Sequence, residues 1–467
     1  MTEVSFSWRT LLPWIQKQRW CPKNASLDLV HAQKLGADGI WLLFLSAGTA
    51  ILPVPVLAQD SSAPAVDAST PEMGSPLSVV EASAPEIGNP LPVVEASAHP
   101  LFAKALLTLS GLTAPEDLTV KPLGAEQSNT SLVLYSKEFS KPLLLKFIRV
   151  LFPGEHPEVK VGAALSKSGS QVIPRFYGSA VVEIAGVSYT LSVLSEFLSE
   201  AKDAWKLFTE DTAASCLAAS LGAATLQLHV DLAAAFTQTT PLFLTHLIDR
   251  IQAEYQYTQA KLPQDSEFLT TLAAPLAKLC EKLFTSKEAS LSSAIDSSAQ
   301  LEFASAQLKS PSAQSITAPK EPIANPISLL PTQLIHGDFH LGQVLHTPAN
   351  DKFPWKFVDF EGEPLRPLES RHKADLALRD CAGMLRSFSY AAAVKYGLSS
   401  KARKWEETTR EAFLAGYFPH GISDFEKQLL TVLEFEKACY EYRYETAFRP
   451  NWQWIPQQSL KRFGEIS

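Results

Sequence analysis

The hydrophobic positions of this chain change their period about halfway along its length. From about Leu118 to Ser199 short apolar runs dominate, and only residues 157–166 have a helical pattern. After Trp205 the apolar spacing becomes helical. A strand-rich part followed by a helix-rich part predicts an α+β architecture. The expected strands are 131–135, 142–148 and 181–193, and the expected helices are 212–236, 240–262, 265–287, 373–396, 402–417 and 422–447.

Residues 1–58 predict a small β-rich unit that opens with a helix around Trp8 to Gln18. From Gly39 to Ala58 the chain carries no charge for 20 residues, about the length of a membrane span. Two prolines and the turn-like residues 46–49 interrupt this segment. We therefore expect two buried strands joined by a turn, and no membrane association.

Two segments have low sequence complexity. Residues 60–100 are rich in Pro, Ala and Ser and contain an imperfect tandem repeat, residues 71–84 and 85–98. Two copies are too few for a solenoid, so we expect a flexible duplicated insertion, with a partner-binding motif as the alternative. Residues 288–328 predict a second, disordered insertion.

Composition narrows the class of protein. A chain of 467 residues predicts two or three domains. The net charge of -8 argues against a nucleic-acid-binding surface, which needs a basic face. The five cysteines are scattered and form no CxxC pair, which favours neither disulfides nor zinc. No signal-peptide pattern opens the sequence, and we expect a cytoplasmic protein.

The strongest chemical signal is residues 336–345, with the sequence HGDFHLGQVL. Residues 357–361 begin 14 residues after Gln343 and predict a short strand that ends in acids. Phosphoryl transfer needs a carboxylate that orients or deprotonates the attacking hydroxyl, and oxygen ligands for magnesium. Asp338 suits the first role, and Gln343 and Asp359 suit the second. This order is typical of kinases, and HGD in place of HRD is typical of those that phosphorylate small molecules, such as aminoglycoside phosphotransferases.

A cation for the phosphates is expected upstream. Lys146 is the single charge in the apolar run 143–148, so we predict a phosphate-pairing role, with an edge-strand lysine reaching solvent as the alternative. The polar turn 124–130 precedes it and lacks GxGxxG. Any phosphate contact there would come from hydroxyls, the Asn129 amide and backbone N–H groups.

Together these segments resemble the bacterial maltokinases, and the resemblance covers nearly the whole chain outside the two insertions. It implies a protein-kinase-like bilobal fold with a small N-terminal β-rich cap subdomain. The cap would comprise residues 1–110, the β-rich nucleotide-binding lobe 111–200, and the helical catalytic and sugar-binding lobe 201–467. The shared segments are 18–20 (QRW), 124–130 (GAEQSNT), 143–147 (LLLKF), 153–158 (PGEHPE), 195–198 (SEFL), 336–345, 358–364 (VDFEGEP), 378–388 (LRDCAGMLRSF), 437–445 (KACYEYRYE) and 449–456 (RPNWQWIP).

The resemblance implies transfer of the ATP γ-phosphate to the anomeric hydroxyl of maltose, giving maltose 1-phosphate for α-glucan or glycogen synthesis, in possible partnership with trehalose synthase. Asp338 would then be the catalytic base, and Gln343 and Asp359 would bind magnesium (Mg2+). The remaining implied nucleotide contacts are Lys146, Ser128 and Asn129 at the phosphates and Glu196, Phe197 and Leu198 at the adenine hinge.

The same resemblance places the sugar on a helix near the C-terminus. Lys437, Tyr440, Glu441 and Tyr444 recur at i, i+3, i+4 and i+7, and so share one helix face. Aromatic faces with a few polar groups suit a sugar ring, although the spacing alone also fits a packed helix face.

Three questions stay open at this stage. The family commonly has a Glu where this chain has Lys160, so the partner of Lys146 is uncertain, with Glu158 as the substitute. The acceptor could be glucose or glucosamine, because the phosphate machinery does not determine it. A non-catalytic regulatory protein with a kinase fold is the remaining alternative.

Overall fold

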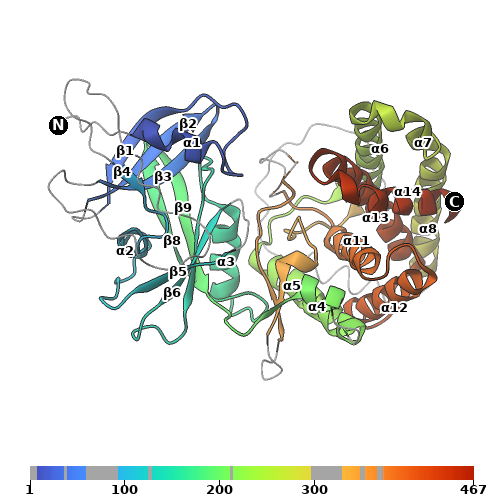
Figure 1. Ribbon diagram of the computed structural model, residues 1–467. Coiled ribbons are helices and arrows are strands. Elements are labelled where there is room, and N and C mark those ends of the chain that lie inside the picture. Colours follow the sequence, from blue (N-terminus) through green and yellow to red (C-terminus); the bar gives the residue numbers. More distant parts are fainter. Residues whose placement is uncertain are drawn as a thin grey trace, which may run out of the picture. The chain divides into compact units, whose positions relative to one another are not determined.

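The computed structural model describes residues 8–35, 39–58, 93–124, 129–210, 214–295, 329–347, 353–364, 366, 371 and 373–466. The chain divides into two compact units (Figure 1). Unit 1 comprises residues 1–169 and 173–200, and unit 2 comprises residues 170–172 and 201–467.

The N-terminal part of unit 1 is a four-stranded antiparallel sheet in the order β1-β2-β3-β4, which we call the cap sheet. The uncharged segment predicted as two strands forms the hairpin of β2 and β3, with Ala47 paired to Ala50 across the turn. Strand β2 is almost wholly buried, because Trp8, Trp20 and neighbouring apolar residues pack against one face of the sheet. The elements are η1 (Trp8–Leu11), α1 (Leu12–Ile15), β1 (Asp28–Lys34), β2 (Ile40–Ala47), β3 (Ala50–Ala58) and β4 (Val93–Glu95).

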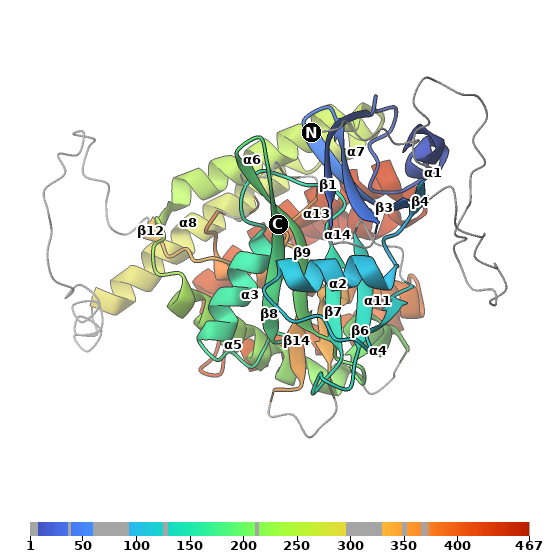
Figure 2. The ribbon, with the colours of Figure 1, turned by 90° about the vertical axis from the view of Figure 1, so that its left-hand side faces the viewer.

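The second part of unit 1 is a five-stranded antiparallel sheet in the order β5-β6-β7-β9-β8. Helix α2 lies across this sheet and contributes Phe102 and Leu106 to the shared core (Figure 2). In β7 the residues Leu143, Leu145 and Phe147 are buried on one face, so Lys146 projects from the other. The elements are α2 (Pro100–Leu109), β5 (Thr119–Pro122), β6 (Thr130–Tyr135), β7 (Leu143–Phe147), α3 (Pro157–Lys167), β8 (Phe176–Ile184) and β9 (Val187–Glu196).

Unit 2 is mainly helical, with short strands beside the catalytic segment. Its first half contains β10 (Lys202–Asp203), α4 (Ala204–Glu210), η2 (Ala214–Leu217), α5 (Ala218–Ala235), β11 (Leu242–Phe243), α6 (Leu244–Lys261), η3 (Pro263–Asp265), α7 (Ser266–Thr270) and α8 (Ala273–Ile295). Its second half contains β12 (Leu329–Leu330), η5 (Leu341–Gln343), β13 (Val344–His346), β14 (Trp355–Phe357), α11 (Ala377–Tyr396), α12 (Ser400–Tyr417), α13 (Asp424–Phe448), η6 (Pro450–Trp452) and α14 (Trp454–Ile466).

Four helices form the frame that carries the site. Helix α11 is the most buried of them, and α13 begins at a capping box made by Ser423 and Glu426. Helices α5 and α12 approach so closely that a Cβ at Gly222 would lie 2.0 Å from the Phe413 carbonyl oxygen, and one at Gly416 would lie 1.9 Å from the Ala219 carbonyl oxygen. Only glycine permits this approach at either position.

Two sequence-based expectations are changed or left aside here. Helix α8 continues to Ile295, into the segment predicted as the second insertion. Residues 288–295 include Ala289, Leu291 and Ala294, which favour helix despite the high serine content. The rest of that insertion, and residues 71–92 of the tandem repeat, lie outside the described residues. Within the described part of the chain, no helix has the combination of length and apolar character that crossing a bilayer requires.

Candidate active site

A buried carboxylate on α11 holds the predicted catalytic segment. Asp380 accepts hydrogen bonds from the backbone N–H of His336 at 2.7 Å and of Gly337 at 3.0 Å. Its Oδ2 also lies 3.1 Å from Nε2 of His229 on α5. Burial raises the pKa of Asp380, but the hydrogen bond and charge of His229 outweigh this and lower the pKa below its usual value. The motif around residues 378–388 was noted from the sequence, but nothing in it assigned this role.

The loop that precedes Asp338 has a conformation that needs glycine. Gly337 has φ +84°, which residues with a Cβ rarely adopt. The imidazole Nε2 of His336 is 2.9 Å from the Val358 carbonyl oxygen, and the ring lies 4.6 Å from that of Phe360. His336 thus braces the loop that carries Asp338.

The two predicted magnesium ligands lie together in unit 2. Strands β13 and β14 pair Val344 with Phe357, which brings Gln343 next to the end of β14. The Gln343 side-chain amide donates to Oδ2 of Asp359 at 2.9 Å. Asp359 has φ +67°, a strained backbone for a residue with a side chain, and such strain is concentrated at functional sites. A carboxylate and an amide side chain are the types of ligand that fit magnesium, the amide through its oxygen.

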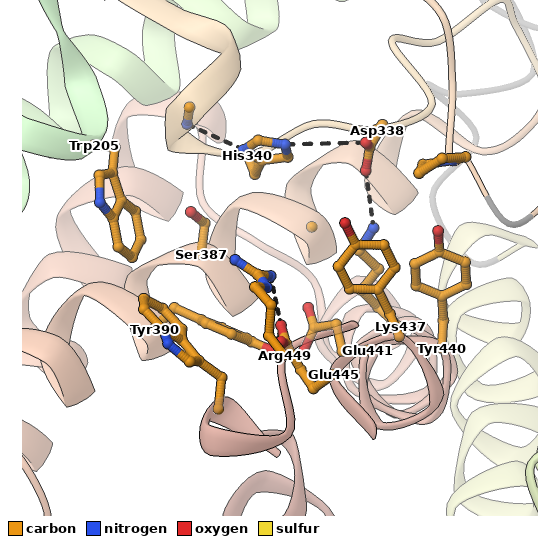
Figure 3. A pocket seen from close by; sticks show the side chains of 15 residues that line it. Trp205, Asp338, His340, Ser387, Tyr390, Lys437, Tyr440, Glu441, Glu445 and Arg449 are labelled. Carbon is orange, nitrogen blue, oxygen red and sulfur yellow. Dashed lines mark hydrogen bonds and ion pairs between the residues drawn. The ribbon is translucent and has the colours of Figure 1, made fainter. Parts of the chain in front are cut away.

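A cavity of about 410 Å³ opens beside Asp338 (Figure 3). It contains Asp338 and all four residues predicted to contact the sugar. The lining residues are Trp205, Asp338, His340, Gly342, Pro364, Gly383, Ser387, Tyr390, Lys437, Tyr440, Glu441, Tyr444, Glu445, Arg449 and Trp452. All four therefore line the cavity from one face of α13, whereas no prediction covered its opposite wall.

Charged partners surround Asp338 at unequal distances. Lys437 Nζ lies 3.3 Å from Oδ1 of Asp338 and 2.6 Å from Oε1 of Glu363. The His340 Nε2 atom lies 4.0 Å from Oδ2 of Asp338. The Asp338 side chain is 20% exposed, so an acceptor hydroxyl in the cavity can reach it. Burial alone would lower the pKa of Lys437, but the charges of Glu363 and Asp338 raise it far above its usual value.

The floor of the cavity carries two buried carboxylates. Both Nε and Nη2 of Arg386 donate to Oε2 of Glu441, each at 2.9 Å. Glu445 accepts from the Tyr390 hydroxyl at 3.1 Å and from Nη2 of Arg449 at 2.6 Å. Burial raises the pKa of both carboxyl groups above the usual value, although their arginine partners oppose the shift. The cavity lining therefore includes two carboxylates, each held by an arginine.

Aromatic rings line the cavity in two groups. Tyr440 and Tyr444 are stacked on α13, with ring centroids 6.4 Å apart. Tyr390 and Trp452 are stacked at 6.1 Å, and Trp205 lies 6.3 Å from Trp452. Figure 3 shows Trp205 on the side of the cavity away from Tyr440. Flat apolar faces with polar groups between them suit the faces and hydroxyl edges of sugar rings.

Lys146 in unit 1 has the substitute partner that the sequence left open. Its Nζ lies 2.8 Å from Oε2 of Glu158 on α3, while Lys160 is exposed. The carboxylate holds the ammonium group above the sheet face opposite the buried leucines. This is the arrangement that a phosphate-pairing lysine requires.

Several of the other predicted nucleotide contacts make hydrogen bonds or ion pairs within unit 1. Oδ1 of Asn129 accepts from the backbone N–H of Arg149 at 3.1 Å. The Glu196 carboxylate pairs with Lys141, and the N–H groups of Glu196 and Phe197 donate to backbone carbonyls. Of the predicted hinge, the Leu198 N–H has no backbone hydrogen bond recorded within the described residues. Ser128 lies outside the described residues.

Comparison with known proteins supports a kinase fold. No protein-family model matches the chain. The chain is 29% identical over 136 residues to the glucosamine kinase of Streptacidiphilus jiangxiensis, and 29% identical over 140 residues to that of Mycolicibacterium smegmatis. These matches cover 27% and 28% of this chain, and only 30% and 34% of the two relatives.

Solved structures match over almost the whole chain. A glucosamine kinase crystal structure (crystal form B) superposes with a TM-score of 0.59 at 19% identity, over 95% of this chain and 96% of that one. A glucosamine kinase in complex with glucosamine, ADP and inorganic phosphate gives a TM-score of 0.57 at 19% identity, over 96% of both chains. The predicted fold class, α+β and protein-kinase-like, is confirmed.

Proposed function

We propose that this chain is an ATP-dependent sugar kinase in which Asp338 activates the acceptor hydroxyl. The observation that carries the proposal is the cavity in which Asp338, Lys437 and the stacked tyrosines of α13 meet. The Asp338 carboxylate takes the hydroxyl proton as the acceptor oxygen bonds to the γ-phosphorus and the bond to ADP breaks. Burial of the surrounding charges strengthens these electrostatic interactions.

The nucleotide roles follow the predicted residues. Lys146, held by Glu158, would bind the ATP phosphates, with Ser128 and Asn129 in the turn that precedes β6 and residues 196–198 at the adenine. Asp359 and Gln343 would hold Mg2+. Bound there, magnesium supplies positive charge that neutralises the phosphates.

Glucosamine is the first candidate acceptor. It is named in the kinases that this chain resembles in sequence and in fold. The cavity also suits an ammonium group, because the carboxylates of Glu441 and Glu445 lie in its lining. Glucose has the same ring and hydroxyl pattern but no ammonium group. A preference for glucosamine over glucose would therefore indicate that these carboxylates bind the ammonium group.

Maltose is the second candidate, and the distribution of aromatic rings favours it. The pair Tyr440 and Tyr444 and the group of Trp205, Tyr390 and Trp452 offer two separate platforms, one for each ring of a disaccharide. With this acceptor the product would be maltose 1-phosphate, a precursor for α-glucan or glycogen synthesis, and trehalose synthase would be a partner to test.

The experiment is acceptor profiling with magnesium and ATP. Glucosamine, glucose and maltose are supplied separately, ADP release is measured, and the product is identified by mass. We expect sugar-dependent ADP release, with the largest kcat/KM for glucosamine. Higher kcat/KM for maltose would support the second candidate. No turnover of any sugar, together with no magnesium-dependent ATP binding, would favour a non-catalytic protein with a kinase fold.

A further inference from the structure

The proposed base, Asp338, shares its lysine with a carboxylate that has no assigned role. Lys437 Nζ is 2.6 Å from Oε1 of Glu363 but 3.3 Å from Oδ1 of Asp338. The first distance is that of a strong charge-assisted hydrogen bond, and the second is longer than such bonds usually are. Lys437 is therefore held mainly by Glu363, not by Asp338.

Glu363 is itself fixed from three sides. It follows β14 and is 2% exposed, and its Oε2 accepts from Arg379 of α11 at 2.8 Å. Arg366, three residues later, pairs with the same oxygen. Lys437 of α13 binds the other oxygen. A carboxylate that binds three cations on separate elements is hard to move, so it sets where the lysine ammonium lies.

The ion pairs continue below the cavity as one connected network. Arg250 of α6 binds Asp375 and Glu436, and Arg379 binds Asp375 as well as Glu363. Among the described residues, these ion pairs join four cations to three carboxylates besides Asp338. The cations are Arg250, Arg366, Arg379 and Lys437, and the carboxylates are Glu363, Asp375 and Glu436.

Lys437 is the cation of this network that lines the cavity. The ring of Tyr440 lies 4.9 Å from its ammonium group. The negative charge of the phosphoryl group and of the attacking oxygen increases at this place during transfer. A fixed cation there stabilises the transition state only if it does not also neutralise the base.

We propose that Glu363 is a positioning residue for the proposed phosphoryl transfer: it holds Lys437 away from a tight ion pair with Asp338. The inference rests on the proposed function. A cation that closes on a carboxylate stabilises the ionised form and occupies the oxygen that must accept the proton. While Glu363 holds Lys437, Asp338 keeps an oxygen for the acceptor hydroxyl, and Lys437 keeps its own proton throughout the step.

The first test is Glu363→Gln, which removes the charge with little change of size. Lys437 then has Asp338 as its nearest carboxylate, with Glu441 and the Tyr440 ring as its other neighbours. We expect kcat to fall about 100-fold while KM for ATP changes less than about twofold. Glu363→Asp keeps the charge and is expected to recover most of kcat. Equal loss in both variants would indicate a packing role and would overturn the proposal.

A double-mutant cycle separates positioning from a structural effect. If Glu363 acts through Lys437, then Glu363→Gln has little further effect on kcat in a Lys437→Met background. If its role is structural, the two effects multiply, and the proposal fails. The matched control is Glu434→Gln. Glu434 lies on α13, the helix that carries Lys437; its buried carboxylate accepts two 2.7 Å hydrogen bonds from Arg410 and does not line the cavity. The kcat of this control variant is expected to equal that of the wild type.

A crystal structure of Glu363→Gln gives a readout that does not depend on activity. We expect the Lys437 Nζ to Asp338 Oδ1 distance to shorten from 3.3 Å to about 2.8 Å. An unchanged distance would refute the inference even if the protein proves to be a sugar kinase. If the wild type phosphorylates no sugar, the proposed function fails, while this distance still decides whether Glu363 controls the lysine.

Discussion

Each unit contains a lysine–glutamate ion pair, and the two pairs differ in burial and in the number of other charged side chains that they contact. Lys146 and Glu158 meet at 2.8 Å, and their side chains are 15% and 20% exposed. Lys437 and Glu363 meet at 2.6 Å, and their side chains are 14% and 2% exposed. Glu158 binds one lysine, whereas Glu363 also binds two arginines. Substitution of a partly solvated pair should affect only its own surroundings. Substitution within a buried network should affect every helix and loop that contributes a charge to it.

The largest expected effect concerns Asp338, the carboxylate that only the second pair contacts. Asp338→Asn is expected to lower kcat by about 10²–10⁴-fold, because the amide cannot take the hydroxyl proton. Steady-state kinetics with saturating ATP and glucosamine measure kcat, and circular dichroism checks the fold. Asp424→Asn on the exposed first turn of α13 is the control. Turnover near the wild-type rate would refute the assignment of the base.

The sequence predicted the parts of the site that are local. The segment 336–345 and Asp359 were found because the spacing of a kinase catalytic loop is a short-range sequence pattern, and Lys146 was found as the single charge in the apolar run 143–148. The set Lys437, Tyr440, Glu441 and Tyr444 came from the resemblance, and helical periodicity placed the four residues on one face.

The rest of the site depends on tertiary contacts that leave no periodic signal. Glu363 is 74 residues from Lys437 and 16 from Arg379 in sequence, so no local pattern predicts that they pair. Trp205 and Trp452 line the same cavity, although they lie near opposite ends of the unit 2 sequence. Asp380 lies on α11, which is buried all round from residue 380 to 392, whereas an acidic residue in a helical pattern predicts solvent exposure.

The next prediction compares the two pairs directly through stability. Glu363→Gln removes the carboxylate from three cations in a buried setting, and is expected to lower the free energy of unfolding by about 3–5 kcal/mol. Glu158→Gln leaves Lys146 partly in water, and is expected to cost at most about 1 kcal/mol. Urea unfolding of both variants measures the difference. Equal destabilisation in the two variants would mean that the buried network around Glu363 adds no stability beyond that of the Lys146–Glu158 pair.

Loss of Lys146 tests the first pair through catalysis. Lys146→Met is expected to lower kcat/KM for ATP by about 10²–10³-fold, because a cation on the phosphates is lost. Unfolding stability should change little. Lys121→Met, an exposed lysine of the same sheet, is the matched control. If both variants keep wild-type kcat/KM for ATP, Lys146 has no phosphate role.

The network also predicts a dependence of stability on acid. Burial alone would raise the pKa of Asp375, but Arg250 and Arg379 lower it to about 2. A carboxyl group with a lowered pKa in the folded state stabilises the fold at pH values above its unfolded pKa, and this stabilisation is lost as the pH falls through the folded pKa. The difference in Tm between wild type and Asp375→Asn should therefore be constant from pH 7 to about 5 and shrink toward about pH 2. A difference that does not depend on pH would show that the charge of Asp375 is not the stabilising factor.

The smallest expected effect is at the turn that precedes β6, where Asn129 anchors the backbone of Arg149 at 3.1 Å. Asn129→Ala removes one hydrogen bond and is expected to lower the free energy of unfolding by about 1 kcal/mol. Thr119→Ala on the exposed face of β5 is the control. Calorimetric titration with magnesium-ATP then tells whether the amide also contacts phosphates. If the residue only anchors the turn, the protein stays almost fully folded and Kd for ATP changes less than about twofold. A much larger rise in Kd would assign the Asn129 amide a direct contact with the nucleotide, and would make the first pair part of a wider phosphate site.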